Sequence, residues 1–138
     1  MQILHVALWT QNLEGMKYFY SKFFGGKINP LYFNRKKEFE SYFITFANSA
    51  VSIELMSKTS VRKRVKGPVI GIAHIAFKAG SMLDVRNFTQ ALKNQGVPVI
   101  KEPRITGDGY FESVVADPDG NEIEIVADAA EPKPKKQK

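Results

Sequence analysis

The sequence predicts an α+β protein made of two similar halves, each with a strand, a helix and further strands. Two observations lead to this prediction. The apolar residues change from a period of two to a helical period and back again, twice along the 138 residues. The local sequence also repeats: the text around His5 resembles that around His74, and the text around Glu54 resembles that around Glu124, with a spacing of roughly 70 residues.

The first half begins with a strand whose alternate residues, among them His5 and Trp9, share one face. Asn12 is expected to cap a helix that starts at Leu13, and the glycines at 25 and 26 end this helix. An Asn-Ser turn then separates two further strands. The strands of this half are predicted at residues 3–10, 42–47 and 51–56.

The second half repeats this order. Ser81 caps its helix, with Asp84 at the third helical position, and Gly96 ends the helix. The Asp-Pro-Asp-Gly-Asn text at 117–121 is typical of a turn, here between the last two strands. The strands of this half are predicted at residues 70–78, 97–100, 110–116 and 122–127.

The formal net charge of +6 lies mostly outside the predicted strands. Residues 57–68 hold five basic and no acidic side chains, and the C-terminal tail holds four lysines. We therefore divide the chain into a first module, a basic linker, a second module and a disordered basic tail, at residues 1–57, 58–69, 70–128 and 129–138. A nucleic-acid partner is not expected, because no predicted element combines basic residues with interleaved aromatic ones.

The composition also excludes several classes of protein. The chain has no cysteine, which rules out a disulfide scaffold, a thiolate zinc site and a cysteine nucleophile. No secretory leader is recognisable, and no apolar run approaches the length of a membrane span. We expect a cytoplasmic protein that does not enter a membrane.

Four residues stand out because the repeat pairs them. His5 and His74 are the only histidines, and each precedes a strand glutamate, Glu54 or Glu124, by about fifty residues. A single strand histidine or glutamate is usually structural, but a curved sheet of two equal halves would bring all four together. Two imidazoles and two carboxylates suit a divalent metal ion: zinc, nickel or cobalt, with iron or manganese as further options.

The chain resembles the vicinal oxygen chelate superfamily, which includes glyoxalase I (lactoylglutathione lyase), bleomycin resistance proteins and dioxygenases. The resemblance covers residues 1 to 127. It is carried by the text at 5–9, 24–26, 73–77 and 117–125, of which the Asp-Pro-Asp-Gly-Asn turn with its Ile-Glu-Ile strand is the most specific. It implies two βαβββ modules that form an open, cup-shaped, eight-stranded mixed sheet with the helices outside.

Within the superfamily, the chain most resembles the glyoxalase I group, because it has a glutamate in both modules. The resemblance then implies metal ligation by His5, Glu54, His74 and Glu124. It also implies lyase or isomerase chemistry on a small carbonyl substrate through a metal-chelated enediolate. Glu124 would be the main base, with Glu54 as its counterpart. Relatives of this size are commonly homodimers, and we expect a homodimer here.

Further residues are expected to line the substrate pocket. Trp9 and Met56 share faces with His5 and Glu54, while Tyr110 and Glu112 lie on a strand that would pass the site. Tyr42 is another candidate if it faces inward. Related enzymes that use a glutathione adduct carry arginine at the position of Trp9, so a glutathione substrate is in doubt. An aromatic wall there either contacts an apolar or planar ligand or fills the core.

Two alternatives use the same fold. The first is a non-haem iron dioxygenase, which needs only two histidines and one carboxylate and would leave Glu54 unexplained. The second is a non-catalytic protein that binds a small molecule, as resistance proteins do, and it requires no metal at His5 and His74.

Overall fold

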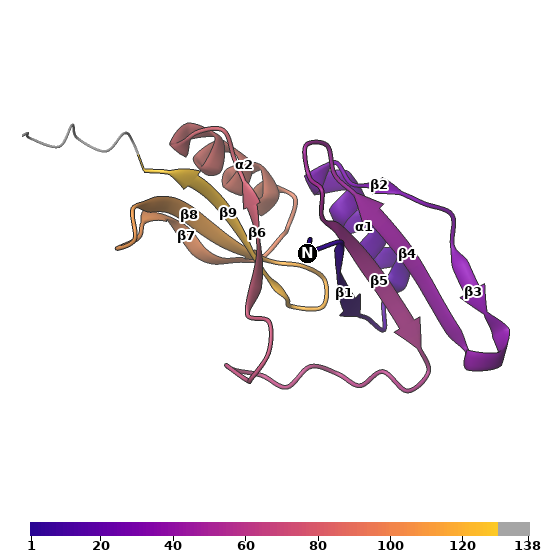
Figure 1. The fold of residues 1–138 in the computed structure, drawn as a ribbon. Helices are drawn as coiled ribbons and strands as arrows, with labels where there is room; N and C mark the ends of the chain where they lie inside the picture. The colour runs from indigo at the N-terminus through magenta and orange to yellow at the C-terminus, as the bar shows by residue number, and fades with distance from the viewer. Residues whose placement is uncertain (130–138) are drawn as a thin grey trace, which may run out of the picture. The chain divides into compact units, whose positions relative to one another are not determined.

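The computed structural model describes residues 1–129, which form two compact units, Met1–Val69 and the chain from Ile70 onward (Figure 1). Each unit has its own helix, sheet and core, and each is described here by itself. The α+β class with two modules that contain one helix each, predicted from the repeat, is confirmed. Residues 130–138 of the predicted tail lie outside the described residues.

Unit 1 contains a mixed sheet and one α-helix. Its elements are β1 (His5–Trp9), α1 (Leu13–Phe24), β2 (Lys27–Ile28), β3 (Tyr32–Asn34), the 3₁₀ turn η1 (Arg35–Lys37), β4 (Phe39–Thr45) and β5 (Ser52–Lys58). β1 runs parallel to β5, β5 is antiparallel to β4, and both short strands pair with β4. The interruption around Pro30 therefore splits one edge strand into β2 and β3, and this accounts for a fifth strand in a module expected to have four.

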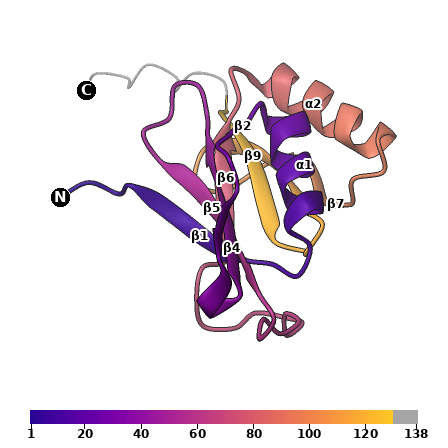
Figure 2. The same ribbon diagram turned by 90° about the vertical axis from the view of Figure 1, so that its right-hand side faces the viewer.

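The helix of unit 1 covers one face of its sheet (Figure 2). Asn12 caps the helix as expected: its Oδ1 accepts a hydrogen bond from the Gly15 amide at 3.0 Å. The buried side of α1 packs against the sheet side chains that alternate inward from β4 and β5. This core consists of Leu13, Met16, Phe19, Tyr20, Ile44, Ile53 and Leu55.

Unit 2 has the order β-α-β-β-β. Its elements are β6 (His74–Lys78), α2 (Met82–Asn94), β7 (Val99–Ile105), β8 (Tyr110–Ala116) and β9 (Glu122–Asp128). The sheet order is β6-β9-β8-β7, with β6 parallel to β9, as β1 is to β5. Val85, Thr89 and Leu92 of α2 are buried, together with the inward residues of β8 and β9. α2 lies on one face of this sheet, and His74 and Glu124 lie on the other.

The turn at 117–121 is held by one buried carboxylate. Asp117 is 3% exposed, and its Oδ1 accepts hydrogen bonds from the amides of Asp119 and Asn121. Its Oδ2 accepts a third from Asn121 Nδ2 at 2.8 Å. This turn fixes the register between β8 and β9, in which Val114 lies opposite Glu124. The motif that carries the family resemblance therefore sets the position of the predicted ligand.

Several element boundaries differ from the predictions. The first strand of each unit begins later than expected, at His5 and His74, although the Leu4 carbonyl still accepts a hydrogen bond from the Ser52 amide at 3.1 Å. The second predicted strand lies earlier, as β4. β7 continues past Pro103, because an edge strand tolerates a residue without an amide hydrogen. β5 extends to Lys58, the first residue of the predicted linker.

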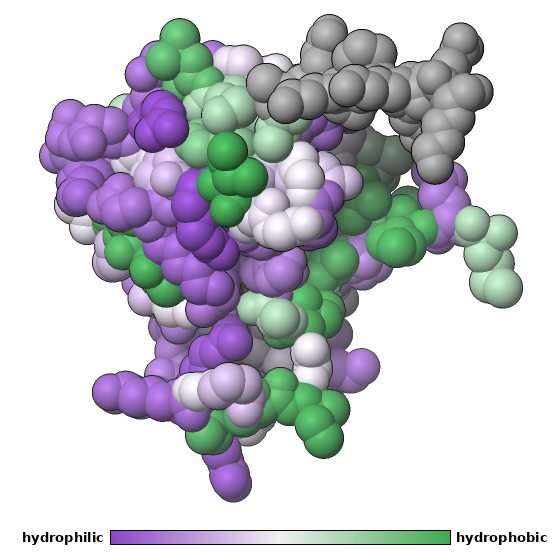
Figure 3. Space-filling view, turned by 90° about the vertical axis from the view of Figure 1, so that its left-hand side faces the viewer, coloured by the Kyte–Doolittle hydropathy of each residue, from purple (hydrophilic) through white to green (hydrophobic). Residues whose placement is uncertain are grey.

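On the face drawn in Figure 3, hydrophilic side chains predominate, and exposed hydrophobic side chains occur in several places. Two such groups lie just before the first strands, with Ile3 and Leu4 before β1 and Ile70 and Ile72 before β6. Neither helix in residues 1–129 has the length and apolar character needed to cross a membrane.

Candidate functional site

In unit 1, His5 and Glu54 meet on the sheet face opposite the helix. His5 pairs with Ser52 and Ala7 with Glu54 in the parallel register of β1 and β5, so that both side chains project from one face. His5 Nε2 lies 3.4 Å from Glu54 Oε2. The imidazole is 34% exposed and the carboxylate 14%, so the pair is partly buried yet open to solvent on one side.

Aromatic side chains surround this pair. Phe43 of β4 lies opposite Glu54, and its ring meets the His5 ring edge to face at 5.2 Å between centroids. Further along the same face, the rings of Trp9 and Phe39 meet at 6.2 Å. The Phe43 ring contacts one side of the His5 imidazole, whose Nε2 points at the Glu54 carboxylate.

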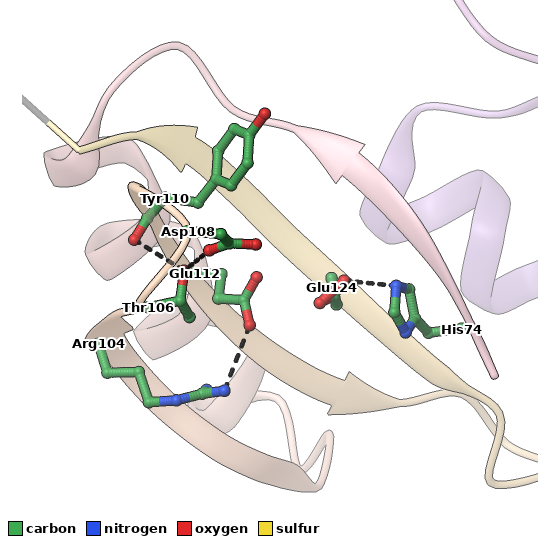
Figure 4. Close-up of polar contacts among 7 residues, drawn as sticks. All are labelled: His74, Arg104, Thr106, Asp108, Tyr110, Glu112 and Glu124. Carbon is green, nitrogen blue, oxygen red and sulfur yellow. Dashed lines mark hydrogen bonds and ion pairs between the residues drawn. The ribbon is translucent and has the colours of Figure 1, made fainter. Parts of the chain in front are cut away.

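In unit 2, His74 and Glu124 repeat the arrangement on neighbouring strands (Figure 4). His74 Nε2 lies 2.7 Å from Glu124 Oε2, within hydrogen-bond distance, and the glutamate side chain is again 14% exposed. The pair opens into a cleft of about 470 Å³. The cleft lining includes His74, Lys78, Tyr110, Glu112, Glu124 and Asp128.

A second carboxylate stands beside Glu124. Glu112 of β8 lies between Arg104 and Glu124 in Figure 4, and Arg104 Nη2 donates to its Oε1 at 3.2 Å. Burial raises the pKa of the Glu124 carboxyl above its ordinary value; the His74 imidazole opposes this effect and Glu112 adds to it. A nearby cation would remove the cost of burying this charge.

The two faces are otherwise chemically different. The register pairs place corresponding residues at the same points of the two sheets. Four positions differ between the units. Trp9 of unit 1 corresponds to Lys78 of unit 2, Ser41 to Glu112, Phe39 to Tyr110, and Lys58 to Asp128. The His–Glu pair is thus common to both units, whereas these four points carry two aromatic rings in unit 1 and three charged side chains in unit 2.

Each pair offers a divalent ion one imidazole nitrogen and one carboxylate oxygen. This donor set fits a first-row metal, and in both pairs the two donor atoms already face each other. Within residues 1–129, no three histidine or acidic side chains cluster closely enough to hold an ion by themselves. The described part of each unit therefore offers an ion two of the four side chains that the sequence predicts as ligands.

The other predicted residues are placed as follows. Trp9 and Met56 lie on the face of His5 and Glu54, and Tyr110 and Glu112 line the cleft with Glu124. Tyr42 does not face inward, because it lies on the helix side, where its hydroxyl donates to Glu14 Oε1 at 2.8 Å. Ile44, two residues further along β4, is also buried on the helix side.

Several residues of these faces were not identified from the sequence, among them Phe39, Phe43 and Arg104. Phe39, Ser41 and Phe43 are spaced two residues apart and therefore share one face of β4. This period of two predicts their position once the start of the strand is known. Arg104 gave no such signal, because its position opposite Glu112 follows two register shifts in β7.

The chain belongs to the Glyoxalase/Bleomycin resistance protein/Dioxygenase superfamily, whose profile matches residues 2–125. The match spans both units and all four residues of the His–Glu pairs. The resemblance inferred from the sequence motifs is thereby confirmed.

Individual relatives are more distant. The chain is 36% identical over 61 residues to an uncharacterised protein, YqjT, of Bacillus subtilis (strain 168), a match that covers 42% of this chain and 48% of YqjT. The fold is similar to that of a glyoxalase family protein from Enterococcus faecalis, with 23% identity, 91% and 97% coverage of the two chains, and a TM-score of 0.76.

Glyoxalase I from Zea mays has a similar fold as well, with 24% identity and a TM-score of 0.77. The match covers 96% of this chain but only 47% of the maize chain, so this chain spans about half the length of that enzyme. At these identities the likeness is one of fold.

Proposed function

We propose that the chain is a divalent-metal-dependent lyase or isomerase of the glyoxalase type, acting on a small carbonyl compound with two neighbouring oxygen atoms. One observation carries the proposal: the same His–Glu pair occurs at the same point of both sheets, with donor atoms 3.4 Å and 2.7 Å apart. A purely structural role does not explain why this pair is the same in both units, because most of the other corresponding residues on the two faces differ.

His5, Glu54, His74 and Glu124 would hold the ion, which we take to be zinc, nickel or cobalt, with iron or manganese as further options. When bound, the ion would polarise the carbonyl oxygen and increase the acidity of the neighbouring C–H group. Glu124 would take this proton on a carboxylate oxygen and return it to the adjacent carbon. Glu54 has the equivalent place in unit 1.

Other residues would act on the substrate or on the base. The His74 imidazole, 2.7 Å from Glu124 Oε2, orients that carboxylate. Tyr110 and Glu112 line the cleft beside it, and Trp9 and Met56 would contact substrate on the unit 1 face. A complete ligand set requires two His–Glu pairs, which would meet within one chain or between two copies of it. We propose a homodimer, as is common for relatives of this size.

Metal content and metal-dependent stability test the proposal directly. Purified protein should contain a first-row metal, and the metal-free protein should gain several degrees in melting temperature when zinc, nickel or cobalt is added. His74→Ala should abolish most of this gain. Glu102→Gln is a matched control, because it removes an exposed carboxylate of unit 2 that pairs with Lys93 outside the site.

Turnover tests the role of Glu124. With 2-oxoaldehydes, in the presence and absence of thiols, Glu124→Gln should lower the rate roughly 10²–10⁴-fold, the usual contribution of a general base. Absence of metal together with no stabilisation by any of the three ions would refute the proposal. Full activity of Glu124→Gln would exclude this residue as the base, and oxygen uptake with a catechol would assign the iron dioxygenase reaction instead.

A further inference from the structure

A group of aromatic side chains lies on the open face of unit 1, where unit 2 has only one ring, Tyr110, at the corresponding points. We define the aromatic group as Trp9, Tyr32 and Phe39, together with Lys58. Trp9 is 48% exposed and Tyr32 is 53% exposed, although both are large rings. Exposed rings gathered on a functional face are a typical ligand-contact surface.

The register places the aromatic group on the same face as the His5–Glu54 pair. Tyr32 lies opposite Ser41, Ser41 opposite Met56, and Met56 opposite Trp9, so that these residues form one row across the sheet. The row is two residues from Glu54 along β5, a distance of about 7 Å. A single small molecule can therefore reach from the pair to the rings.

The rings are arranged to receive a flat ligand. Phe39 meets Trp9 and Tyr32 edge to face, with 6.2 Å between centroids in both cases. Edge-to-face neighbours hold one another in place and keep ring faces available for a further ring. Asn34 adds to this by donating to the Tyr32 hydroxyl at 3.4 Å.

The aromatic group also carries a positive charge. Lys58 Nζ lies 4.9 Å from the centroid of the Trp9 ring, and among the described residues no acidic side chain forms an ion pair with it. At the corresponding points of unit 2, Lys78 and Asp128 form an ion pair at 3.3 Å. The ammonium group of unit 1 is thus available to an anion from solution, while that of unit 2 is neutralised.

We propose that the aromatic group binds a planar aromatic ring that bears a carboxylate or a similar anion. The ligand ring lies against Trp9, Tyr32 and Phe39, and its anion binds the Lys58 ammonium. This inference rests on the proposed function for its link to catalysis: the substrate of the reaction carries such a ring about 7 Å from its reacting oxygens. The binding step itself requires no metal.

The single tryptophan provides a specific readout. Trp9 is the only tryptophan in the chain, so the ¹⁵N–¹H spectrum has one indole signal, and it reports on this face. In metal-free protein, 2-naphthoate should shift this signal saturably. Cyclohexanecarboxylate, with the charge but no aromatic ring, and 2-naphthol, with the ring but no carboxylate, should each bind roughly tenfold more weakly.

Lys58→Gln should weaken naphthoate binding roughly tenfold and leave 2-naphthol binding unchanged. Lys22→Gln is the matched control, since Lys22 Nζ lies 5.2 Å from the Tyr18 ring in a similar pair on α1. It should leave both probes unaffected. Phe39→Leu removes a ring without removing charge, and it should weaken both aromatic probes.

Other results would overturn the inference. Equal binding of naphthoate and cyclohexanecarboxylate would exclude an aromatic site, and equal losses in Lys58→Gln and Lys22→Gln would exclude the specific cation. An indole signal that moves with protein concentration and not with naphthoate would mean that a second copy of the chain covers these rings. Because the measurement uses metal-free protein, it can fail while metal binding succeeds, and the reverse.

Discussion

At the scale of single residues, Tyr42 connects the sheet of unit 1 to its helix. Its ring is buried, and its hydroxyl donates to Glu14 Oε1 at 2.8 Å. Lys17 Nζ lies 2.6 Å from the other oxygen of Glu14 and 4.6 Å from the centre of the Tyr42 ring. The hydrogen bonds from Lys17 and then Tyr42 hold the pKa of the Glu14 carboxyl below its ordinary value.

This cluster predicts a pH-dependent contribution to stability. A lowered folded-state pKa means that the ionised carboxylate stabilises the fold above about pH 4.5, its ordinary value, and that this effect is lost as the pH falls through the folded-state pKa. Because Glu14 is largely exposed, Glu14→Gln should cost only about 0.5 kcal/mol at pH 7, and less at pH 2, where more of the carboxylate is protonated. Urea unfolding at the two values measures the difference.

A double-mutant cycle provides the control for this prediction. In a Tyr42→Phe background the effect of Glu14→Gln should become smaller, because one of the two hydrogen bonds is already absent. An equal cost at pH 2 and pH 7 would mean that ionisation of Glu14 contributes nothing.

At the scale of elements, the end of α1 depends on two adjacent glycines for different reasons. Gly25 has a left-handed backbone, with φ of 65°, and space for a side chain. At Gly26 an added Cβ would lie 2.5 Å from Ile44 Cγ2 and 3.0 Å from the Tyr20 carbonyl oxygen. The close approach of α1 to β4 therefore depends on Gly26.

The two glycines should respond differently to alanine. Gly25→Ala should lower the free energy of unfolding by about 1 kcal/mol, through backbone strain alone. Gly26→Ala should cost roughly 2–3 kcal/mol, since the buried Ile44 side chain must move. Thermal or urea unfolding of the two variants compares them, and a larger cost at Gly25 would show that the helix end can shift away from β4.

The elements also show which features were predictable. The period of two in β5 and β9 placed Glu54 and Glu124 on the open faces, because their neighbours are apolar. β2 and β3 have two and three residues, too few to show a period. The Arg104–Glu112 contact depends on a bulged register, which local sequence does not encode. The partner of Glu112 was therefore harder to predict from the sequence than Glu112 itself.

At the scale of the whole molecule, the charge distribution follows the division into units. The segment between β5 and β6 is largely exposed and forms neither helix nor strand. It carries Arg62, Lys63, Arg64 and Lys66. The segment was predicted from its composition, whereas the pairing of β1 with β5 depends on long-range contacts that composition cannot specify.

Limited proteolysis should cleave the segment between β5 and β6 first. Within residues 1–129, trypsin at low ratio should cut first after Arg62, Lys63, Arg64 or Lys66, because the backbone there is exposed and outside both sheets. Mass spectrometry should then identify two fragments whose boundary separates the units. First cleavage within α1 or α2 would contradict the assignment of this segment as a linker.

The edges of the two sheets have a consequence for aggregation. One edge of each sheet is poorly suited to adding another strand: β2 and β3 are short and separated around Pro30, and β7 contains Pro103 and two register shifts. The opposite edges, β1 and β6, are regular strands of five residues without proline. Each sheet can therefore be extended in one direction only, which favours closed assemblies and opposes fibrous growth.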